Sequence, residues 1–164
     1  KENIKFKIIS NLPYAISSPW IEKILSFKLP KTMVLMIQKE ASDRYCALNQ
    51  SKNFSPISIF IQSAYNIHST YKVSPKCFFP QPKVDSKLIR LDLKDKPIIY
   101  TREAKDFIRR VFNNRRKQII STCKNNNFKD SEKWINDCVL KKYKTNIRAE
   151  EIELSIWESL GYKL

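Results

Sequence analysis

The sequence predicts an α/β portion followed by a small, basic, all-helical portion. Three observations support this fold class. The continuous apolar run from Met33 to Ile37 is typical of a buried central strand. Strand and helix patterns alternate around this run, as far as residue 93. From Thr101 onward, the apolar residues keep helical spacing alone.

The α/β portion begins with a short strand over residues 5–10 that is predicted to be buried. Ser18 is a suitable N-cap for the next helix, with Pro19 at its first position. One face of that helix is apolar, with Trp20, Ile21, Ile24 and Leu25. The later elements are a strand at 33–37 covered on both faces, helices at 39–48 and 57–64 around a polar loop at 49–53, and strands at 65–74 and 84–93.

The helical portion begins after a boundary at residues 94–97, which predicts domains at 1–96 and 97–164. Thr101 can cap a helix whose apolar residues are Ala104, Phe107, Ile108, Val111 and Phe112. Two more helices are marked by Ile119, Ile120 and Cys123, and by Trp134, Ile135, Cys138 and Val139. Ser155 and Glu158 match a capping box for a fourth, and Gly161, the only glycine, is expected at its end.

The composition indicates a globular protein with a polyanionic partner. The chain has 164 residues, of which 42% are apolar, and 31 Lys and Arg against 16 Asp and Glu give a net charge of +15. Such an excess favours nucleic acid as the partner, although a basic surface can also serve solubility alone. No apolar run reaches membrane-spanning length, so no membrane partner is expected.

The cysteines do not match a metal site. Cys46, Cys77, Cys123 and Cys138 lie far apart, and His68 is the only histidine. This spacing excludes the usual zinc patterns and does not suggest a small disulfide scaffold. We expect buried or half-buried reduced thiols in a cytoplasmic protein, and no metal.

Asn11, Leu12, Pro13 and Tyr14 follow the first predicted strand. Proline lacks an N–H, and its carbonyl is expected to be free to accept a hydrogen bond. The Asn11 side chain adds a second acceptor, and Tyr14 adds a flat ring. Two acceptors fit the exocyclic amine of a planar base, and the ring fits the face of that base. The lone pair of the amine nitrogen then points at an electrophile. The alternative is a capped strand end with an incidental tyrosine.

Five segments occur in order along the chain: NLPYAISSP, QKEASDRY, FFPQPKVDS, FNNRRKQI and RAEEIELS. Together they resemble the ribosomal RNA adenine dimethyltransferases, which dimethylate two adjacent adenines near the 3′ end of small-subunit rRNA. The resemblance runs from Lys7 to the C-terminus. It implies the C-terminal half of a Rossmann-like class I methyltransferase core, S-adenosylmethionine as methyl donor, and a helical domain that docks on the immature small subunit. A cytoplasmic monomer is expected.

The resemblance also implies roles for four residues. Asn11 and the Pro13 carbonyl would hold the adenine N6 amine, and Asn11 would also lie against the methionine end of the donor. Tyr14 would stack on the flipped base, and Phe78 would close its other face. No general base is required, because the amine attacks a sulfonium methyl and positioning can carry the step.

A basic cluster on the helical portion is expected to contact RNA phosphates. Its residues, with Lys83 as a weaker candidate near the base-binding segment, are Arg109, Arg110, Arg115, Arg116 and Lys117. The alternative is a solvated face. Trp134 and Trp157 have core spacing, so we expect them to pack rather than to stack on bases.

The resemblance places a glycine-rich turn and two acidic donor-binding residues upstream of Lys1. Most of the donor site is therefore expected outside this sequence, and the chain alone is expected to be inactive. One alternative is a non-catalytic RNA-binding or ribosome-assembly module. Another is a large-subunit methyltransferase of the erythromycin-resistance type, although Leu12, Asp85 and the FNNRRK and RAEE segments favour the small-subunit enzymes.

Overall fold

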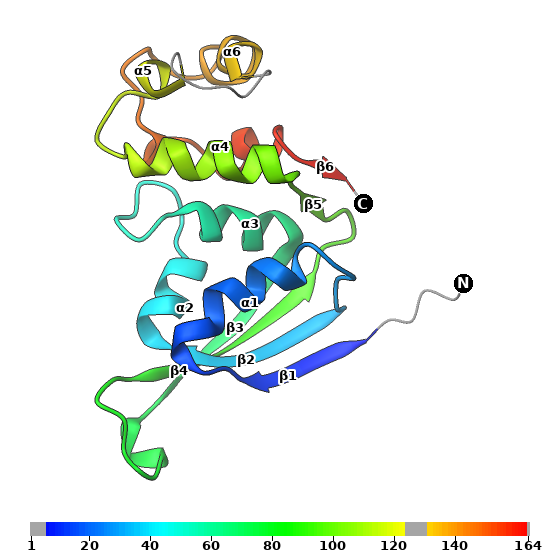
Figure 1. Cartoon of the computed structure of the whole chain (residues 1–164), viewed down its shortest axis with the longest axis vertical. Helices are drawn as coiled ribbons and strands as arrows, with labels where there is room; N and C mark the ends of the chain where they lie inside the picture. Colours follow the sequence, from blue (N-terminus) through cyan, green and yellow to red (C-terminus); the bar gives the residue numbers. More distant parts are fainter. Residues whose placement is uncertain (1–5, 124–130, 164) are drawn as a thin grey trace.

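The computed structural model describes residues 6–123 and 131–163 and shows a sheet with helices stacked beside it (Figure 1). The strands are β1 (Lys7–Asn11), β2 (Thr32–Gln38), β3 (Tyr65–Val73), β4 (Ser86–Leu93), β5 (Ile98–Ile99) and β6 (Tyr162–Lys163). The α-helices are α1 (Ser17–Ile24), α2 (Lys39–Tyr45), α3 (Pro56–Ala64), α4 (Arg102–Asn113), α5 (Ile119–Cys123), α6 (Ser131–Trp134) and α7 (Leu154–Glu158). Three 3-10 turns are η1 (Tyr14–Ile16), η2 (Pro75–Cys77) and η4 (Ala149–Glu151), and η3 (Ile135–Val139) is a π-helix.

The main sheet has the strand order β1-β2-β4-β3. β1 is parallel to β2, with Asn11 opposite Met36, whereas β4 is antiparallel to both β2 and β3. The carboxyl ends of β1, β2 and β3 therefore lie at one edge of the sheet, together with the start of β4. The segment after Asn11 and the β3–β4 connection at 74–85 meet at this edge.

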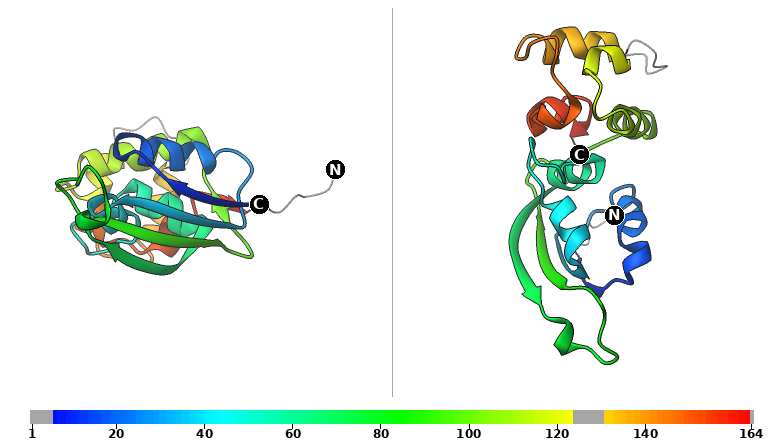
Figure 2. Two further views of the ribbon diagram at one scale, coloured as in Figure 1. Left: turned by 90° about the horizontal axis from the view of Figure 1, so that it is seen from below. Right: turned by 90° about the vertical axis from the view of Figure 1, so that its left-hand side faces the viewer.

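β2 is covered on one face rather than on both. Met33, Leu35 and Ile37 are fully buried, while the alternating residues of the strand are half-buried. Helices α1, α2 and α3 lie on one side of the sheet (Figure 2). The prediction of a strand covered on both faces was therefore wrong for the described residues. The prediction that the first strand is buried was wrong as well, because no side chain of β1 is buried and Ile9 is 84% exposed.

Helix α3 lies between the sheet and the later helices, and all of its residues from Ile57 to Ala64 are buried (Figure 1). Its start is stabilised by a capping box between Ser55 and Ser58, with Pro56 at the first turn. Its polar residues have partners, as burial requires. Gln62 Nε2 donates to the carbonyls of Tyr45 and Ala47, each at 2.8 Å. Ser63 Oγ is 2.7 Å from the Tyr100 hydroxyl.

The helical portion packs onto this core through α4 and a row of aromatic rings. The predicted cap of α4 is confirmed, since Thr101 Oγ1 accepts from Ala104 N at 3.2 Å. Its predicted apolar face is buried, apart from the half-buried Phe112. Ring contacts with centroids 5.0–5.9 Å apart join Phe54, Phe112, Trp157, Trp134 and Phe107. Both tryptophans pack in the core, as expected.

Two predicted helix starts were wrong. α1 begins at Ser17 with Ile16 as N-cap, because the η1 turn leads directly into it. Ser18 lies inside the helix, 3.0 Å from the Tyr45 hydroxyl. Glu153, rather than Ser155, is the N-cap of α7, and Ser155 is the second residue of that helix.

Gly161 follows α7, as predicted, but the reason lies in packing. A Cβ at this position would lie 2.4 Å from Ile98 Cγ2 and 2.7 Å from the Ile99 carbonyl oxygen. The glycine therefore allows β6 to pair with β5 after α7.

Candidate active site

A cavity of about 300 Å³ lies at the sheet edge where β1 ends. Seven residues from two segments line it: Asn11, Leu12, Pro13, Phe78, Phe79, Pro80 and Pro82. None of them carries a charge. Three of the four residues expected to contact the base, Asn11, Pro13 and Phe78, thus line one cavity, although Phe78 is far from the other two in sequence.

The backbone holds the first wall of this cavity in place. Leu12 N donates to Met36 O at 3.1 Å, which extends the pairing of β1 with β2 by one residue. The Leu12 side chain is buried, whereas Asn11 and Pro13 are exposed on either side of it. The buried Leu12 therefore anchors the segment that carries the Asn11 amide and the Pro13 carbonyl.

The Pro13 carbonyl is not free, contrary to expectation. It accepts from Ile16 N at 3.1 Å, because Pro13 is the N-cap of η1. A carbonyl oxygen has a second lone pair, so it can still accept from a ligand. The backbone of Tyr14 begins the same turn, but its side chain lies outside the described part of the structure.

The second wall comes from the β3–β4 connection. Ser74 Oγ accepts from Lys76 N at 3.3 Å and caps η2, after which Phe78 has an extended backbone. Phe78 is half-buried, and Phe79 is fully exposed. The prediction singled out Phe78 but missed Phe79, Pro80 and Pro82, although all three belong to the same FFPQP run.

At the same end of the sheet, where β2 ends and β4 begins, Asp43 of α2 joins two lysines. Its carboxylate lies 3.0 Å from Lys39 Nζ and 2.6 Å from Lys87 Nζ, so it ties α2 to β4. Burial raises the pKa of Asp43, whereas the hydrogen bonds from Lys87 and Lys39 and the charges of these lysines lower it. The lowering is larger, so the pKa lies below its ordinary value. Lys39 N also donates to the Asp85 carbonyl at 3.0 Å. These contacts brace the edge that carries the cavity.

Two of the arginines expected to contact RNA are bound within the protein. Arg109 pairs with Glu22 at 2.5 Å and Asp106 at 2.9 Å, and lies over the Phe60 ring. Arg115 pairs with Glu150 and donates to the carbonyls of Ser51 and Lys52. Both guanidinium groups thus join elements that are distant in sequence.

The other basic candidates are exposed. Arg110 lies on α4, and Arg116 and Lys117 follow the helix in the next turn. Lys83 is exposed in the β3–β4 connection, one residue beyond Pro82 of the cavity. Arg110 Nε donates to the Asp106 carbonyl at 3.4 Å, but all four side chains are exposed and a phosphate can contact them.

The family model for ribosomal RNA adenine dimethylase matches residues 1–160. The chain belongs to this family. Its cavity at the end of β1 is lined by Asn11, Leu12 and Pro13 of the NLPY segment that first suggested the resemblance.

Two relatives in this family share more than a third of their aligned residues with the chain. A ribosomal RNA small subunit methyltransferase A from Opitutus terrae is 41% identical over 155 residues, which cover 94% of this chain and 56% of that protein. The protein of the same name from Mycoplasma genitalium is 37% identical over 151 residues, covering 92% and 57%. The chain thus spans about half the length of the curated relatives it matches.

Solved structures support the fold. A dimethyladenosine transferase from Plasmodium falciparum matches with a TM-score of 0.74 at 26% identity, over 96% of this chain and 66% of that one. The 23S rRNA methyltransferase ErmE matches with a TM-score of 0.62 at 16% identity, over 95% and 64%, which shows likeness of fold alone. This member of the adenine dimethylase family thus has the mixed α/β fold of the C-terminal part of a class I methyltransferase. No helix among the described residues is both long and apolar enough to span a membrane.

Proposed function

We propose that this chain is the base-binding and RNA-docking part of an S-adenosylmethionine-dependent adenine N6-dimethyltransferase. Its substrate is small-subunit rRNA, with two adjacent adenines near the 3′ end as targets and the immature small subunit as partner. The single observation that carries the proposal is the uncharged cavity that joins Asn11 and Pro13 to Phe78. The names of the relatives support the choice of rRNA substrate.

The proposed division of labour follows the two portions of the chain. Residues 1–96 form part of the catalytic core, and residues 97–164 form a helical domain that helps dock on RNA. The protein acts as a cytoplasmic monomer. A large-subunit substrate is the weaker alternative, because the likeness to the 23S rRNA enzyme is one of fold alone.

The cavity fits the target base better than it fits the whole methyl donor. Its lining supplies amide, carbonyl and aromatic groups but no carboxylate for ribose hydroxyls, and the only glycine of the chain is the distant Gly161. Asn11 supplies one edge of the donor site. S-adenosylmethionine, when bound, supplies an electrophilic methyl group on a positively charged sulfur.

The residues of the cavity then act by positioning. The Asn11 side-chain oxygen and the remaining lone pair of the Pro13 carbonyl accept the two hydrogens of the adenine N6 amine. Its nitrogen lone pair is thereby directed out of the base plane. Phe78 covers one face of the extruded base and Tyr14 the other, which excludes water and limits rotation. The uncharged walls fit a neutral base, and phosphates are left to the exposed lysines and arginines.

The test is the Asn11→Ala variant of the complete encoded protein. Single-turnover methylation of small-subunit rRNA should fall by about 100-fold or more, because one positioned acceptor is lost in the transition state. RNA binding, measured by filter retention, should stay near the wild-type value.

Asn136→Ala removes another exposed amide, on η3, and should leave both measurements unchanged. Wild-type turnover by Asn11→Ala would exclude the base clamp. Preferred methylation of large-subunit rRNA in the same assay would replace the proposed substrate while retaining the site.

A further inference from the structure

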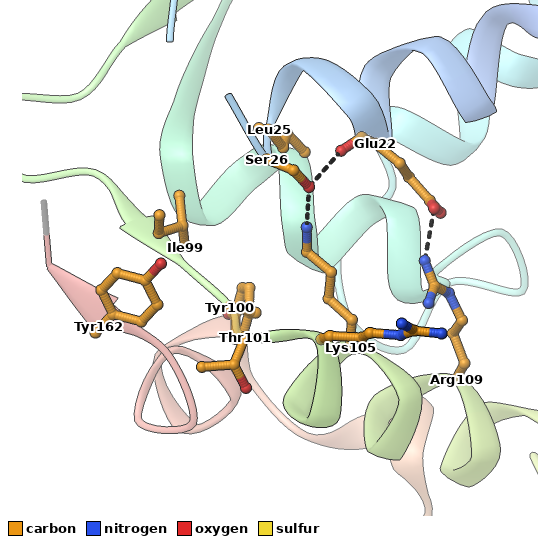
Figure 3. Close-up of a pocket in the computed structure, with 10 residues that line it drawn as sticks. Glu22, Leu25, Ser26, Ile99, Tyr100, Thr101, Lys105, Arg109 and Tyr162 are labelled. Atoms are coloured by element: carbon orange, nitrogen blue, oxygen red, sulfur yellow. Dashed lines mark hydrogen bonds and ion pairs between the residues drawn. The ribbon is translucent and has the colours of Figure 1, made fainter. Parts of the chain in front are cut away.

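A second cavity, of about 430 Å³, lies between α1, α4 and the β5–β6 pair (Figure 3). It lies at the opposite end of the sheet from Asn11. Both α1 and β4 begin near the carboxyl end of β1 and run away from it toward this cavity. Its volume is within the range of small-molecule sites. Ten residues line it: Glu22, Leu25, Ser26, Ile99, Tyr100, Thr101, Arg102, Lys105, Arg109 and Tyr162.

Lys105 is the unusual residue of this cavity. It is only 9% exposed, and its Nζ has a single described acceptor, Ser26 Oγ at 2.8 Å. That hydroxyl in turn donates its only hydrogen to the Glu22 carbonyl at 2.9 Å (Figure 3). An ammonium group has three N–H donors, and the described residues satisfy one of them.

The buried charge of Lys105 lacks a counter-ion. Within residues 6–123 and 131–163, no carboxylate forms an ion pair with its Nζ, and the Glu22 carboxylate is bound to Arg109 at 2.5 Å. Burial lowers the pKa of Lys105, while the Glu22 charge raises it and the Arg109 charge lowers it. Buried charges in proteins are normally paired. An anion that enters the cavity would therefore stabilise the charged form of Lys105.

The rest of the lining indicates which anion fits. The lining has three cations, Lys105, Arg102 and Arg109, and one carboxylate, Glu22. A second carboxylate, Asp106, lies beside them and pairs with Arg109 at 2.9 Å and Arg102 at 4.0 Å, so one positive charge is in excess. The start of α4, at Thr101 and Arg102, adds the positive end of a twelve-residue helix. A phosphate group matches this charge and its several donors.

The opposite wall is apolar. Figure 3 shows Ile99 and the Tyr162 ring across the cavity from Lys105, and Tyr162 is 48% exposed. A half-exposed ring next to a cationic pocket suits a ligand that has a flat ring and a phosphate. We propose that this cavity binds a nucleotide through its phosphate, with Lys105 and Arg102 on the phosphate and Tyr162 against the base. The nucleotide is either free or part of an RNA strand.

The experiment uses the complete encoded protein and three probes: inorganic phosphate, uridine monophosphate and a short labelled single-stranded RNA. Calorimetry follows the first two, and fluorescence anisotropy follows the third. Uridine monophosphate avoids the adenine site, so this test does not depend on the methyl-transfer proposal. Lys105→Met should weaken binding of the responding probe by about tenfold or more, since charge-assisted hydrogen bonds are lost.

Lys133→Met is the matched control, because it removes an exposed lysine on α6. Tyr162→Ala should weaken uridine monophosphate but not inorganic phosphate. Binding of the small probes indicates a free nucleotide, and an effect on RNA alone indicates a strand. If Lys105→Met does not fold, Arg102→Gln at the exposed rim must weaken binding instead. Equal binding by the wild type and these variants, or no binding of any probe, overturns the proposal.

Discussion

Asn11, Arg109 and Arg115 illustrate what decides the role of a polar side chain in this protein. Asn11 is exposed beside an uncharged cavity, and no intramolecular partner among the described residues occupies its amide. Arg109 and Arg115 look from the sequence like members of an RNA-binding cluster, yet both are bound to carboxylates of the same chain. Whether a polar side chain already has a partner within the protein, more than its residue type, separates candidate functional groups from structural ones.

The reactivity of individual cysteines tests the exposure of single side chains. Cys77 is exposed directly before Phe78, contrary to the expectation of buried or half-buried thiols, whereas Cys123 is buried. Burial raises the pKa of the Cys123 thiol to about 12. Iodoacetamide at pH 8 should therefore label Cys77 in the native protein and reach Cys123 only after unfolding, because the thiolate is the reactive form.

Peptide mass spectrometry measures both rates, with Cys77→Ser as the control. Bound substrate RNA should slow the labelling of Cys77, since Phe78 lines the proposed base site. Equal labelling of Cys77 and Cys123 in the native protein would show that the burial of Cys123 is wrong.

At the scale of elements, a few contacts fix how strands and helices meet. The Asp43 carboxylate joins α2 to β4, and the close approach at Gly161 joins the end of α7 to β5. The Thr32 hydroxyl on β2 donates to Asp92 of β4 at 2.8 Å. Each contact links segments whose separation in sequence hides it from local pattern analysis.

The Asp43 contact predicts a pH-dependent stability. Because its pKa is lower when folded than the ordinary 3.8, its stabilising effect is present above that value and is lost as the pH falls through the folded pKa. Asp43→Asn should lower the free energy of unfolding by about 1 kcal/mol at pH 7. The difference should disappear at a pH well below 3.8.

Urea denaturation at both pH values measures this difference. Asp95→Asn, at an exposed aspartate after β4, is the control and should have little effect at either pH. A loss of stability that persists unchanged in acid would mean that the carboxylate charge is not responsible.

Gly161 predicts a steric effect. Gly161→Ala places a methyl group against Ile98 and the Ile99 carbonyl, so it should destabilise the protein by about 1–3 kcal/mol and separate β6 from β5. Thermal unfolding measures the loss, with the exposed Ser155→Ala in α7 as the comparison. An unchanged midpoint for Gly161→Ala would contradict the observed close approach.

At the scale of the whole molecule, α3 and the aromatic row place both portions of the chain around one continuous core. Figure 2 shows the layers in sequence, from the sheet through α3 to α4 with α7 and then α5 with α6. The net charge of +15 is therefore carried by a connected body that can present both portions to one polyanion.

This arrangement predicts how the RNA affinity depends on salt. Neutralising Arg116 and Lys117 together as Gln should lower the log–log salt slope by about two, one for each lost phosphate contact. Arg109→Gln should leave that slope unchanged and reduce thermal stability, because its partners are Glu22 and Asp106. Anisotropy titrations at several salt concentrations test both. An unchanged slope in the double variant would assign Arg116 and Lys117 to solubility alone.

Local patterns determined the secondary structure and the family. The alternation of strands and helices, the Thr101 cap and the helical spacing of Phe107, Ile108 and Val111 depend on neighbouring residues, and so they can be recognised in the sequence. The starts of α1 and α7 were misplaced, because neither helix is capped by a side chain: Ile16 and Glu153 are the N-cap residues, and neither forms a side-chain cap hydrogen bond. The NLPY segment was recognised by its chemistry and by its order among the other motifs.

The tertiary structure decided which residues meet and which remain available. Pairing of β1 with β2 and the return of β4 bring Phe78 to the same cavity as Asn11, and this depends on the sheet topology rather than on any local pattern. Packing of α4 against α1 engages Arg109 and buries Lys105, although both appear in the sequence as ordinary basic residues of a helix. Long-range packing sets the partners and the solvation of a side chain, and these determine whether its charge stabilises the fold or can bind a ligand.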